Sequence, residues 1–259
     1  MTPALDTGLA IEREGPLVVL RLDRPRENRL TVGLLRALAA SLTEADADDR
    51  VSAVAITGTG DWFCGGAEMP MTAEGRTEAL LEFGDAWASL RERSTTLGKP
   101  LIGAINGRAF AGGLALTALT DLAFAVPSAS FGLPELQYGI FPMLVLSMVI
   151  TELPRKLAFD LIYRGRVLDA EEARGHGLVN EVVDRSGMAG ALAETAARFA
   201  RSNPEAIRLG RRAYGVMRDL DARSRMEYAR HVAANLLGTR VAAETYRQRL
   251  VSSKPEGTP

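Results

Sequence analysis

Two pairs of adjacent glycines, each directly after an apolar segment, are the part of this 259-residue sequence best suited to chemistry. The pairs are Gly65-Gly66 and Gly112-Gly113, and an apolar segment with helical character follows the second. Backbone N–H groups in such turns can approach a ligand closely because no side chain intervenes, and the positive end of a helix dipole favours an oxyanion. Two such turns can form an oxyanion hole. Spacing alone leaves open the alternative that the glycines only permit close packing between turns.

The glycine pairs belong to an internal repeat. Residues 55–58 (Ala-Ile-Thr-Gly) lead to residues 63–67 (Phe-Cys-Gly-Gly-Ala), while residues 104–107 (Ala-Ile-Asn-Gly) lead to residues 110–114 (Phe-Ala-Gly-Gly-Leu). The same strand, turn and glycine pair therefore occur twice in the same order. Repetition of one supersecondary unit predicts stacked turns around a shared core.

Hydrophobic periodicity and turn residues predict the elements that must position these turns. Strands are predicted over residues 17–22, 51–57, 122–126 and 178–183, and helices over residues 32–42, 77–97, 114–119, 157–163, 170–174, 190–200, 204–218 and 223–237. The apolar stretches 100–127 and 140–153 are expected to be buried core, since they are interrupted by polar residues or fall short of the roughly 20 residues that span a bilayer. A boundary near residues 184–190 divides a core domain, 1–188, from a helical region, 189–259.

Composition excludes several classes of protein. A formal net charge of -1 and 47% hydrophobic residues are ordinary for a globular protein and favour neither nucleic acid nor membrane as a partner. The single cysteine, Cys64, excludes an intramolecular disulfide and offers no zinc spacing, so no metal site is expected. Residues 1–10 lack a signal-peptide pattern, which predicts a cytoplasmic location. Dinucleotide, P-loop and nucleophile-elbow motifs are absent.

Several segments, in order, resemble the signatures of the crotonase (enoyl-CoA hydratase/isomerase) superfamily. They are residues 63–69 (FCGGAEM), 99–107 (KPLIGAING), 111–113 (AGG), 131–135 (FGLPE) and 177–183 (GLVNEVV). The resemblance implies an α/β fold, a crotonase-like spiral of repeated β-β-α turns with a helical C-terminal region that mediates trimerisation. It also implies an acyl-CoA thioester substrate, with no separate cofactor, and a homotrimer or a hexamer built as a dimer of trimers.

The same resemblance implies roles for individual residues. The amides of Ala67 and Gly112 bind the thioester oxygen, and Glu135 carries protons. The implied substrate-binding residues are Arg26, Asn28, Leu30, Gly65, Ala67, Glu68, Met69, Gly112 and Met143. The arginine-rich turn at residues 24–30 departs from the family's usual asparagine and alanine spacing, so an ordinary solvated turn is an alternative there. Glu68 is either an auxiliary acid or solvent-exposed, and Pro134-Glu135 has the alternative of simply starting a helix.

One departure from the family pattern bears on the reaction. Hydratases of the family use two glutamates, and the position of the first, just after the second glycine pair, is Ala115 here. The lone Glu135 resembles the Δ3,Δ2-enoyl-CoA isomerases, in which one carboxylate removes a proton at C2 and returns it at C4. Burial among apolar groups would raise its pKa to suit both steps. We therefore predict an isomerase; the alternatives are a hydratase or other lyase of the family and a non-catalytic acyl-CoA binding protein.

Overall fold

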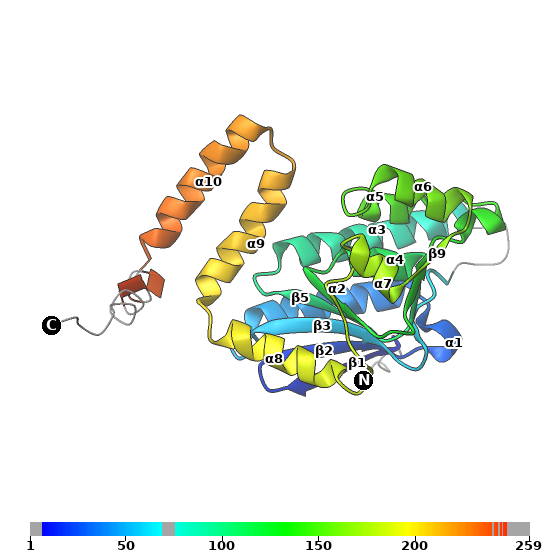
Figure 1. Cartoon of the computed structure of the whole chain (residues 1–259), viewed down its shortest axis with the longest axis horizontal. Coiled ribbons are helices and arrows are strands. Elements are labelled where there is room, and N and C mark those ends of the chain that lie inside the picture. The colour runs from blue at the N-terminus through cyan, green and yellow to red at the C-terminus, as the bar shows by residue number, and fades with distance from the viewer. Residues whose placement is uncertain (1–6, 69–75, 240, 243, 245, 248–259) are drawn as a thin grey trace.

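The structure, a computed structural model, describes residues 7–68, 76–239, 241, 242, 244, 246 and 247, and it contains two β-sheets with helices around them (Figure 1). The first sheet has the strand order β1-β2-β3-β5-β7-β10, and the second has the order β4-β6-β8-β9. All neighbouring strands are parallel except β1 with β2 and β8 with β9. This is the expected mixed α/β crotonase fold, which is thereby confirmed.

The elements follow one another along the chain in repeated groups. The strands are β1 (Leu9–Glu14), β2 (Leu17–Leu22), β3 (Ala53–Gly58), β4 (Trp62–Cys64), β5 (Leu101–Ile105), β6 (Arg108–Phe110), β7 (Leu122–Ala125), β8 (Ser130–Gly132), β9 (Val167–Asp169) and β10 (Glu181–Val182). The helices are α1 (Pro25–Asn28), α2 (Val32–Ala47), α3 (Arg76–Thr96), α4 (Gly112–Ala118), the 3-10 helix η1 (Glu135–Tyr138), α5 (Met143–Val149), α6 (Arg155–Tyr163), α7 (Ala170–Gly175), α8 (Met188–Ala200), α9 (Pro204–Arg218) and α10 (Ala222–Leu237).

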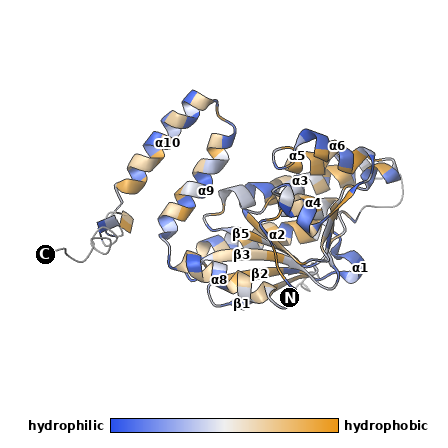
Figure 2. Cartoon of the chain, in the orientation of Figure 1, coloured by the Kyte–Doolittle hydropathy of each residue, from blue (hydrophilic) through white to orange (hydrophobic). Residues whose placement is uncertain are grey.

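The repeat predicted from the glycine pairs is present and has a third copy. In each copy a strand of the first sheet leads directly to a short strand of the second sheet: β3 to β4, β5 to β6, and β7 to β8. The third copy has no glycine pair after its short strand, where Gly132 pairs with Phe110, so its sequence signal is weaker. The apolar strands contribute to two buried hydrophobic clusters, the smaller of which includes Leu192 and Ala196 of α8, and β2 and β3 are largely hydrophobic in Figure 2.

Three expectations need correction. The strand β1 was missed, because its exposed edge position leaves polar residues and an exposed Ile11 in the pattern. The strand predicted over residues 178–183 is confined to β10, Glu181–Val182, because only these two residues pair with β7. The stretch 140–153 is only partly core: Met143 and Ile150 are 66% and 63% exposed, because α5 is a short surface helix that buries only one side.

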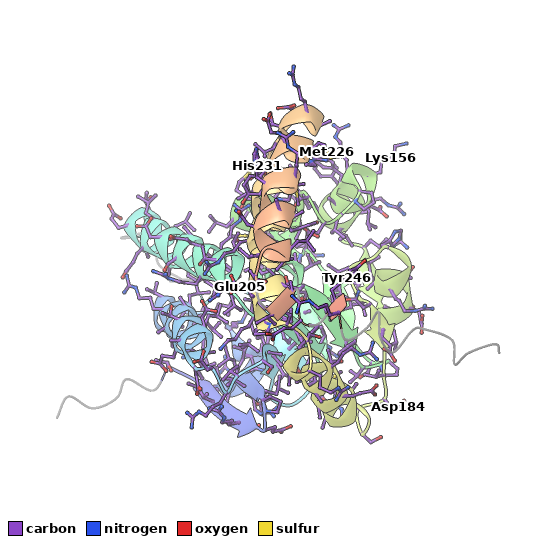
Figure 3. All side chains as sticks on the ribbon, turned by 90° about the vertical axis from the view of Figure 1, so that its left-hand side faces the viewer. Lys156, Asp184, Glu205, Met226, His231 and Tyr246 are labelled. Atoms are coloured by element: carbon purple, nitrogen blue, oxygen red, sulfur yellow. The ribbon has the colours of Figure 1, made fainter. Side chains whose placement is uncertain are left out.

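The last helices extend away from the sheets. Arg211 of α9 fastens that helix to the core, because its guanidinium donates twice to the Asp121 carboxylate at 2.8 Å and also to the Ser94 and Leu97 carbonyls. The helix α10 packs against α9 and buries none of its residues, and Figure 3, which looks onto this end, shows Met226 and His231 on it. Within the described residues, no helix is long and apolar enough to cross a membrane.

Candidate active site

The two glycine turns and the Pro134-Glu135 segment follow three neighbouring strands of the second sheet. The strands β4, β6 and β8 are parallel neighbours, and their register pairs Cys64 with Ala109 and Phe110 with Gly132. The two glycine turns follow β4 and β6, and the Pro134-Glu135 segment follows β8. Because parallel strands end at the same edge, these three segments leave the sheet side by side, at the carboxyl ends where open α/β sheets place their ligands.

The two glycine turns touch each other. A Cβ added to Gly66 would lie 2.7 Å from the Ala111 Cβ and 3.5 Å from the Gly112 nitrogen, and Gly66 has a φ of +100°, which L side chains rarely adopt. A Cβ on Gly113 would lie 2.2 Å from the Cys64 carbonyl oxygen, so α4 can approach β4 only through a glycine. Close packing therefore explains Gly113, and it also brings the first glycine turn against the nitrogen of Gly112.

The predicted oxyanion donors are the backbone N–H groups of Ala67 and Gly112. The Leu30 N–H donates to the Gly66 carbonyl at 2.7 Å, which fixes the peptide plane that carries the Ala67 N–H. In a trans peptide the N–H points opposite to the C=O, so the Ala67 N–H is directed away from Leu30. Gly112 is the first residue of α4, where N–H groups have no partner in the helix. Neither N–H has an acceptor among the residues that the structure describes.

Backbone strain is concentrated in the same turns. Among the described residues, only Arg26, Asn28 and Ala111 are non-glycine residues with positive φ, at 70°, 50° and 51°. Arg26 and Asn28 lie in the turn before Leu30, and Ala111 directly precedes Gly112. Such conformations cost about 1 to 3 kcal/mol each and persist where the surrounding structure enforces them, which is typical of functional sites.

Glu135 is a buried carboxylate without a partner. It begins η1, and both of its carboxylate oxygens are buried and have no hydrogen-bond partner. Loss of hydration on burial disfavours the charged form and raises the pKa of Glu135 to about 7. With this pKa, the protonated and ionised forms of the carboxyl group are both populated near neutral pH. A group that first removes a proton and then returns it needs both forms.

The raised pKa makes a prediction about stability. Folding raises the pKa of Glu135 from 4.5 to about 7, so the folded chain holds this proton more tightly than the unfolded chain, and stability falls as pH rises across that interval. Glu135→Gln cannot ionise and is expected to exceed the wild type in unfolding free energy by about 2 kcal/mol above pH 7, with partial exposure allowed for, and by much less near pH 4. Urea unfolding at both pH values measures the difference. An equal difference at pH 4 and pH 8 would contradict the assigned cause.

The other predicted binding residues differ in their surroundings. Arg26 is exposed on the turn that begins at Arg24, and Leu30 is fully buried between the two glycine turns. Glu68 is 54% exposed and forms an ion pair with Arg24 at 2.5 Å, an interaction that the sequence did not indicate. Gly65 donates its N–H to the Glu27 carbonyl at 2.7 Å.

Three further residues were predicted to bind the substrate. Asn28 is 1% exposed, and its side-chain amide is bonded to backbone groups rather than free for a ligand. Met143, the first residue of α5, is exposed. Met69 lies outside the described residues.

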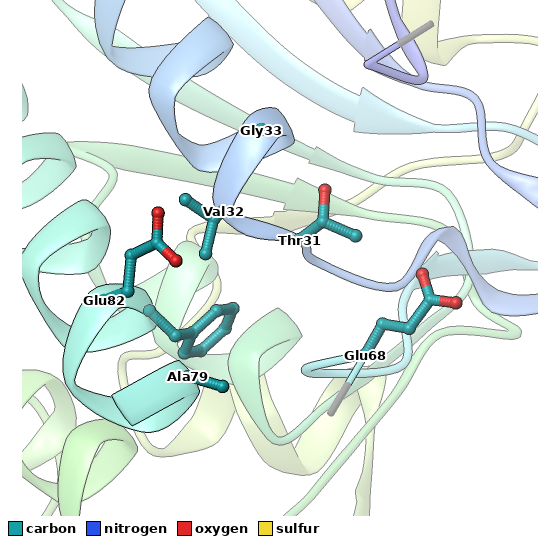
Figure 4. A pocket seen from close by; sticks show the side chains of 7 residues that line it. Thr31, Val32, Gly33, Glu68, Ala79 and Glu82 are labelled. Carbon is teal, nitrogen blue, oxygen red and sulfur yellow. The ribbon is translucent and has the colours of Figure 1, made fainter. Parts of the chain in front are cut away.

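A cavity of about 290 Å³ opens beside the first glycine turn (Figure 4). Its lining residues come from the start of α2, from α3 and from Glu68: they are Thr31, Val32, Gly33, Glu68, Ala79, Glu82 and Phe83. The α3 residues were not predicted as site residues because their helical spacing is equally typical of core packing. Glu68 connects this cavity to the turn that carries Ala67, whereas Glu135 does not line it.

Two residues near the turns are unsuited to direct chemistry. Cys64 is fully buried, and burial raises its thiol pKa to about 12, so the reactive thiolate is not formed near neutral pH. Ala115, where hydratases of the resembled family carry a glutamate, is 1% exposed within α4. A buried methyl group thus stands at the position of the first family glutamate.

Comparison with known proteins assigns the family. The family described as enoyl-CoA hydratase/isomerase matches residues 12–248. Carnitinyl-CoA dehydratases from Salmonella arizonae and Salmonella agona are each 30% identical over 231 residues, covering 87% of this chain and 87% of theirs. Both are dehydratases by description, so they do not support the preference for an isomerase.

Solved structures agree with this assignment. The chain is 26% identical to an enoyl-CoA hydratase from Mycobacterium smegmatis, with a TM-score of 0.89 and coverage of 96% of this chain and 98% of that one. An enoyl-CoA hydratase from Bacillus anthracis is 27% identical, with a TM-score of 0.87 and the same coverage. Human enoyl coenzyme A hydratase domain-containing protein 3, at 21% identity and a TM-score of 0.90, shares the fold. The chain belongs to the enoyl-CoA hydratase/isomerase family.

Proposed function

We propose that this protein is an acyl-CoA double-bond isomerase that uses Glu135 as its only proton carrier. The observation that carries the proposal is the contrast between two positions. Glu135 carries a buried, unpartnered carboxylate on the segment that follows β8, the strand that pairs with β6, while Ala115 stands where hydratases of the family carry the first of their two glutamates. One carboxylate of intermediate acidity is sufficient for a proton shuttle.

The proposed reaction balances with this one group. The ionised Glu135 takes a proton from C2 of a 3-enoyl thioester, and the electrons of that C–H bond form a dienolate whose negative charge rests on the thioester oxygen. The amides of Ala67 and Gly112 stabilise this charge, each contributing about 2.7 to 4 kcal/mol toward the transition state. Protonated Glu135 then returns its proton to C4, which yields the 2-enoyl thioester and regenerates the carboxylate.

A hydratase or dehydratase is the second candidate, and the relatives favour it. The carnitinyl-CoA dehydratases and the bacterial hydratases are described by reactions that remove or add water. In this chain such a reaction needs a second acid or base near the thioester. Glu68, one residue beyond Ala67 and ion-paired with Arg24, is the candidate for this role.

Incubation with acyl-CoA substrates in deuterated water separates these functions. With 3-enoyl-CoA we expect the double bond to migrate with little deuterium in the 2-enoyl product, because Glu135 returns the proton that it removed, and with no 3-hydroxyacyl-CoA formed, as followed by NMR and mass spectrometry. Formation of the hydroxyacyl product from 2-enoyl-CoA, with no migration of the double bond in 3-enoyl-CoA, would replace the isomerase by a hydratase. Tight calorimetric binding with neither reaction nor exchange would instead make the protein a non-catalytic acyl-CoA binder.

A further inference from the structure

We infer that Asn28 is a positioning residue that orients the Ala67 amide, so that the turn at residues 24–30 and the oxyanion hole act as one unit. The inference rests on the proposed binding of a thioester oxygen by Ala67. It adds a residue whose own side chain is buried and cannot contact the thioester.

The Asn28 side chain holds three backbone groups at once. Its Oδ1 accepts from the Arg24 N–H at 3.0 Å, which closes the turn on itself. Its Nδ2 donates to the Thr59 carbonyl at 3.0 Å and to the Trp62 carbonyl at 2.7 Å, which joins the turn to the segment between β3 and β4. Loss of these bonds would cost free energy of folding, because each lost bond leaves a buried backbone group without a hydrogen-bond partner.

The same turn is bonded to the far end of β4. The Gly65 N–H donates to the Glu27 carbonyl at 2.7 Å, the Leu30 N–H to the Gly66 carbonyl at 2.7 Å, and the Glu68 N–H to the Leu30 carbonyl at 2.8 Å. The last two bonds lie on either side of Ala67, and the middle one fixes the peptide that carries its N–H. Residues 24–30 are therefore hydrogen-bonded to the start of β4 by the Asn28 side chain and to the residues just after β4 by their backbone.

The conformation of Asn28 explains why this position suits asparagine. Its φ of 50° is in the left-handed region, which asparagine, aspartate and glycine tolerate best among ordinary residues. Of these three, only asparagine offers both an acceptor for Arg24 and donors for Thr59 and Trp62. The positive φ also redirects the chain so that Leu30 runs beside the first glycine turn, where it forms a parallel bridge with Ala67.

A second asparagine holds the same segment from the opposite side. Asn106 donates to the Gly60 carbonyl at 2.9 Å and to the Trp62 carbonyl at 3.2 Å. The segment that enters β4 is thus fixed by two amides, but only Asn28 belongs to a turn that continues to Ala67. If a bound acyl-CoA displaces residues 24–30, the hydrogen bonds between this turn and the first glycine turn therefore transmit the displacement to the Ala67 peptide.

Two substitutions at Asn28 test the inference. Asn28→Asp keeps the tolerance for positive φ and the acceptor but loses the donors, and Asn28→Gly keeps only the tolerance. We expect each to lower kcat by ~10- to 100-fold, because a small displacement of an oxyanion donor is costly, while the Kd for the acyl-CoA changes less. The control is Asn180→Gly on the first sheet, which removes one bond that an asparagine side chain accepts, from the Ala123 N–H at 2.7 Å.

A spectroscopic measurement separates positioning from a general loss of stability. Bound cinnamoyl-CoA should absorb at longer wavelength as its carbonyl is polarised, and we expect a clear red shift with the wild type and Asn180→Gly and a reduced shift with both Asn28 variants. Full red shift and full kcat in a folded Asn28 variant would overturn the inference and leave the proposed oxyanion hole intact. No red shift with the wild type would overturn the oxyanion hole itself, and the inference with it.

Discussion

Glu135→Gln is expected to lower kcat for double-bond migration by ~10²- to 10⁴-fold, the range that a positioned general acid–base group supplies. Glutamine has nearly the same shape but neither accepts nor returns the proton at C2. The acyl-CoA should bind nearly as well, because the substitution leaves the glycine turns in place and removes a partly charged group from a buried position. Initial rates with 3-enoyl-CoA, together with calorimetric binding of the product, measure both quantities.

Two further results sharpen this prediction. In the wild type, kcat should rise with pH through about 7, where the Glu135 carboxylate becomes the predominant form. Glu181→Gln, which removes an exposed carboxylate from β10, is the control and should keep the rate and the pH profile. If Glu135→Gln turned over at the wild-type rate, Glu135 would have no part in the reaction.

Deleting the Ala67 N–H alone should cost ~10²- to 10³-fold in kcat, as loss of one oxyanion donor does. Incorporation of lactic acid in place of alanine converts the amide into an ester, which removes the donor and keeps the methyl group. The reaction develops negative charge on the thioester oxygen, so the loss should fall on kcat more than on binding of the unreacted thioester. Single-turnover kinetics with 3-enoyl-CoA measures the chemical step directly.

The matched control is the same ester at Ala189, the second residue of α8. Its N–H lies in the first turn of a helix, where amides lack helical partners, so the chemical change is equivalent and the location is not. The ester at Ala189 should leave the rate within about twofold of the wild type. An ester at Ala67 with an unchanged rate would show that the first glycine turn does not bind the reacting oxygen.

Two copies of the repeat, and the turns at which they end, could be predicted from the sequence. The glycine pairs identify the two turns because close contact between them, and the fit of Gly113 against the Cys64 carbonyl, tolerate no side chain. Regular elements such as β2 were predicted at their observed limits, since a continuous apolar run ended by a charged turn has few alternatives.

Contacts between distant segments could not be predicted in the same way. The pair Arg24–Glu68 and the amide bonds of Asn28 join residues about 30 to 45 positions apart, and their partners are largely backbone groups that carry no sequence signal. The burial of Glu135 likewise depends on how the helices after β8 fold back. The trimer expected from the family resemblance stays a prediction, which sedimentation of the full chain would test.

A crystal structure with a bound, unreactive acyl-CoA tests the central arrangement most directly. We expect the thioester oxygen to lie about 2.7 to 3.1 Å from the nitrogens of both Ala67 and Gly112. A carboxylate oxygen of Glu135 should be within about 3.5 Å of C2, the separation of a group ready to react. A thioester oxygen turned away from either amide, or a Glu135 side chain turned into solvent, would contradict the proposed chemistry.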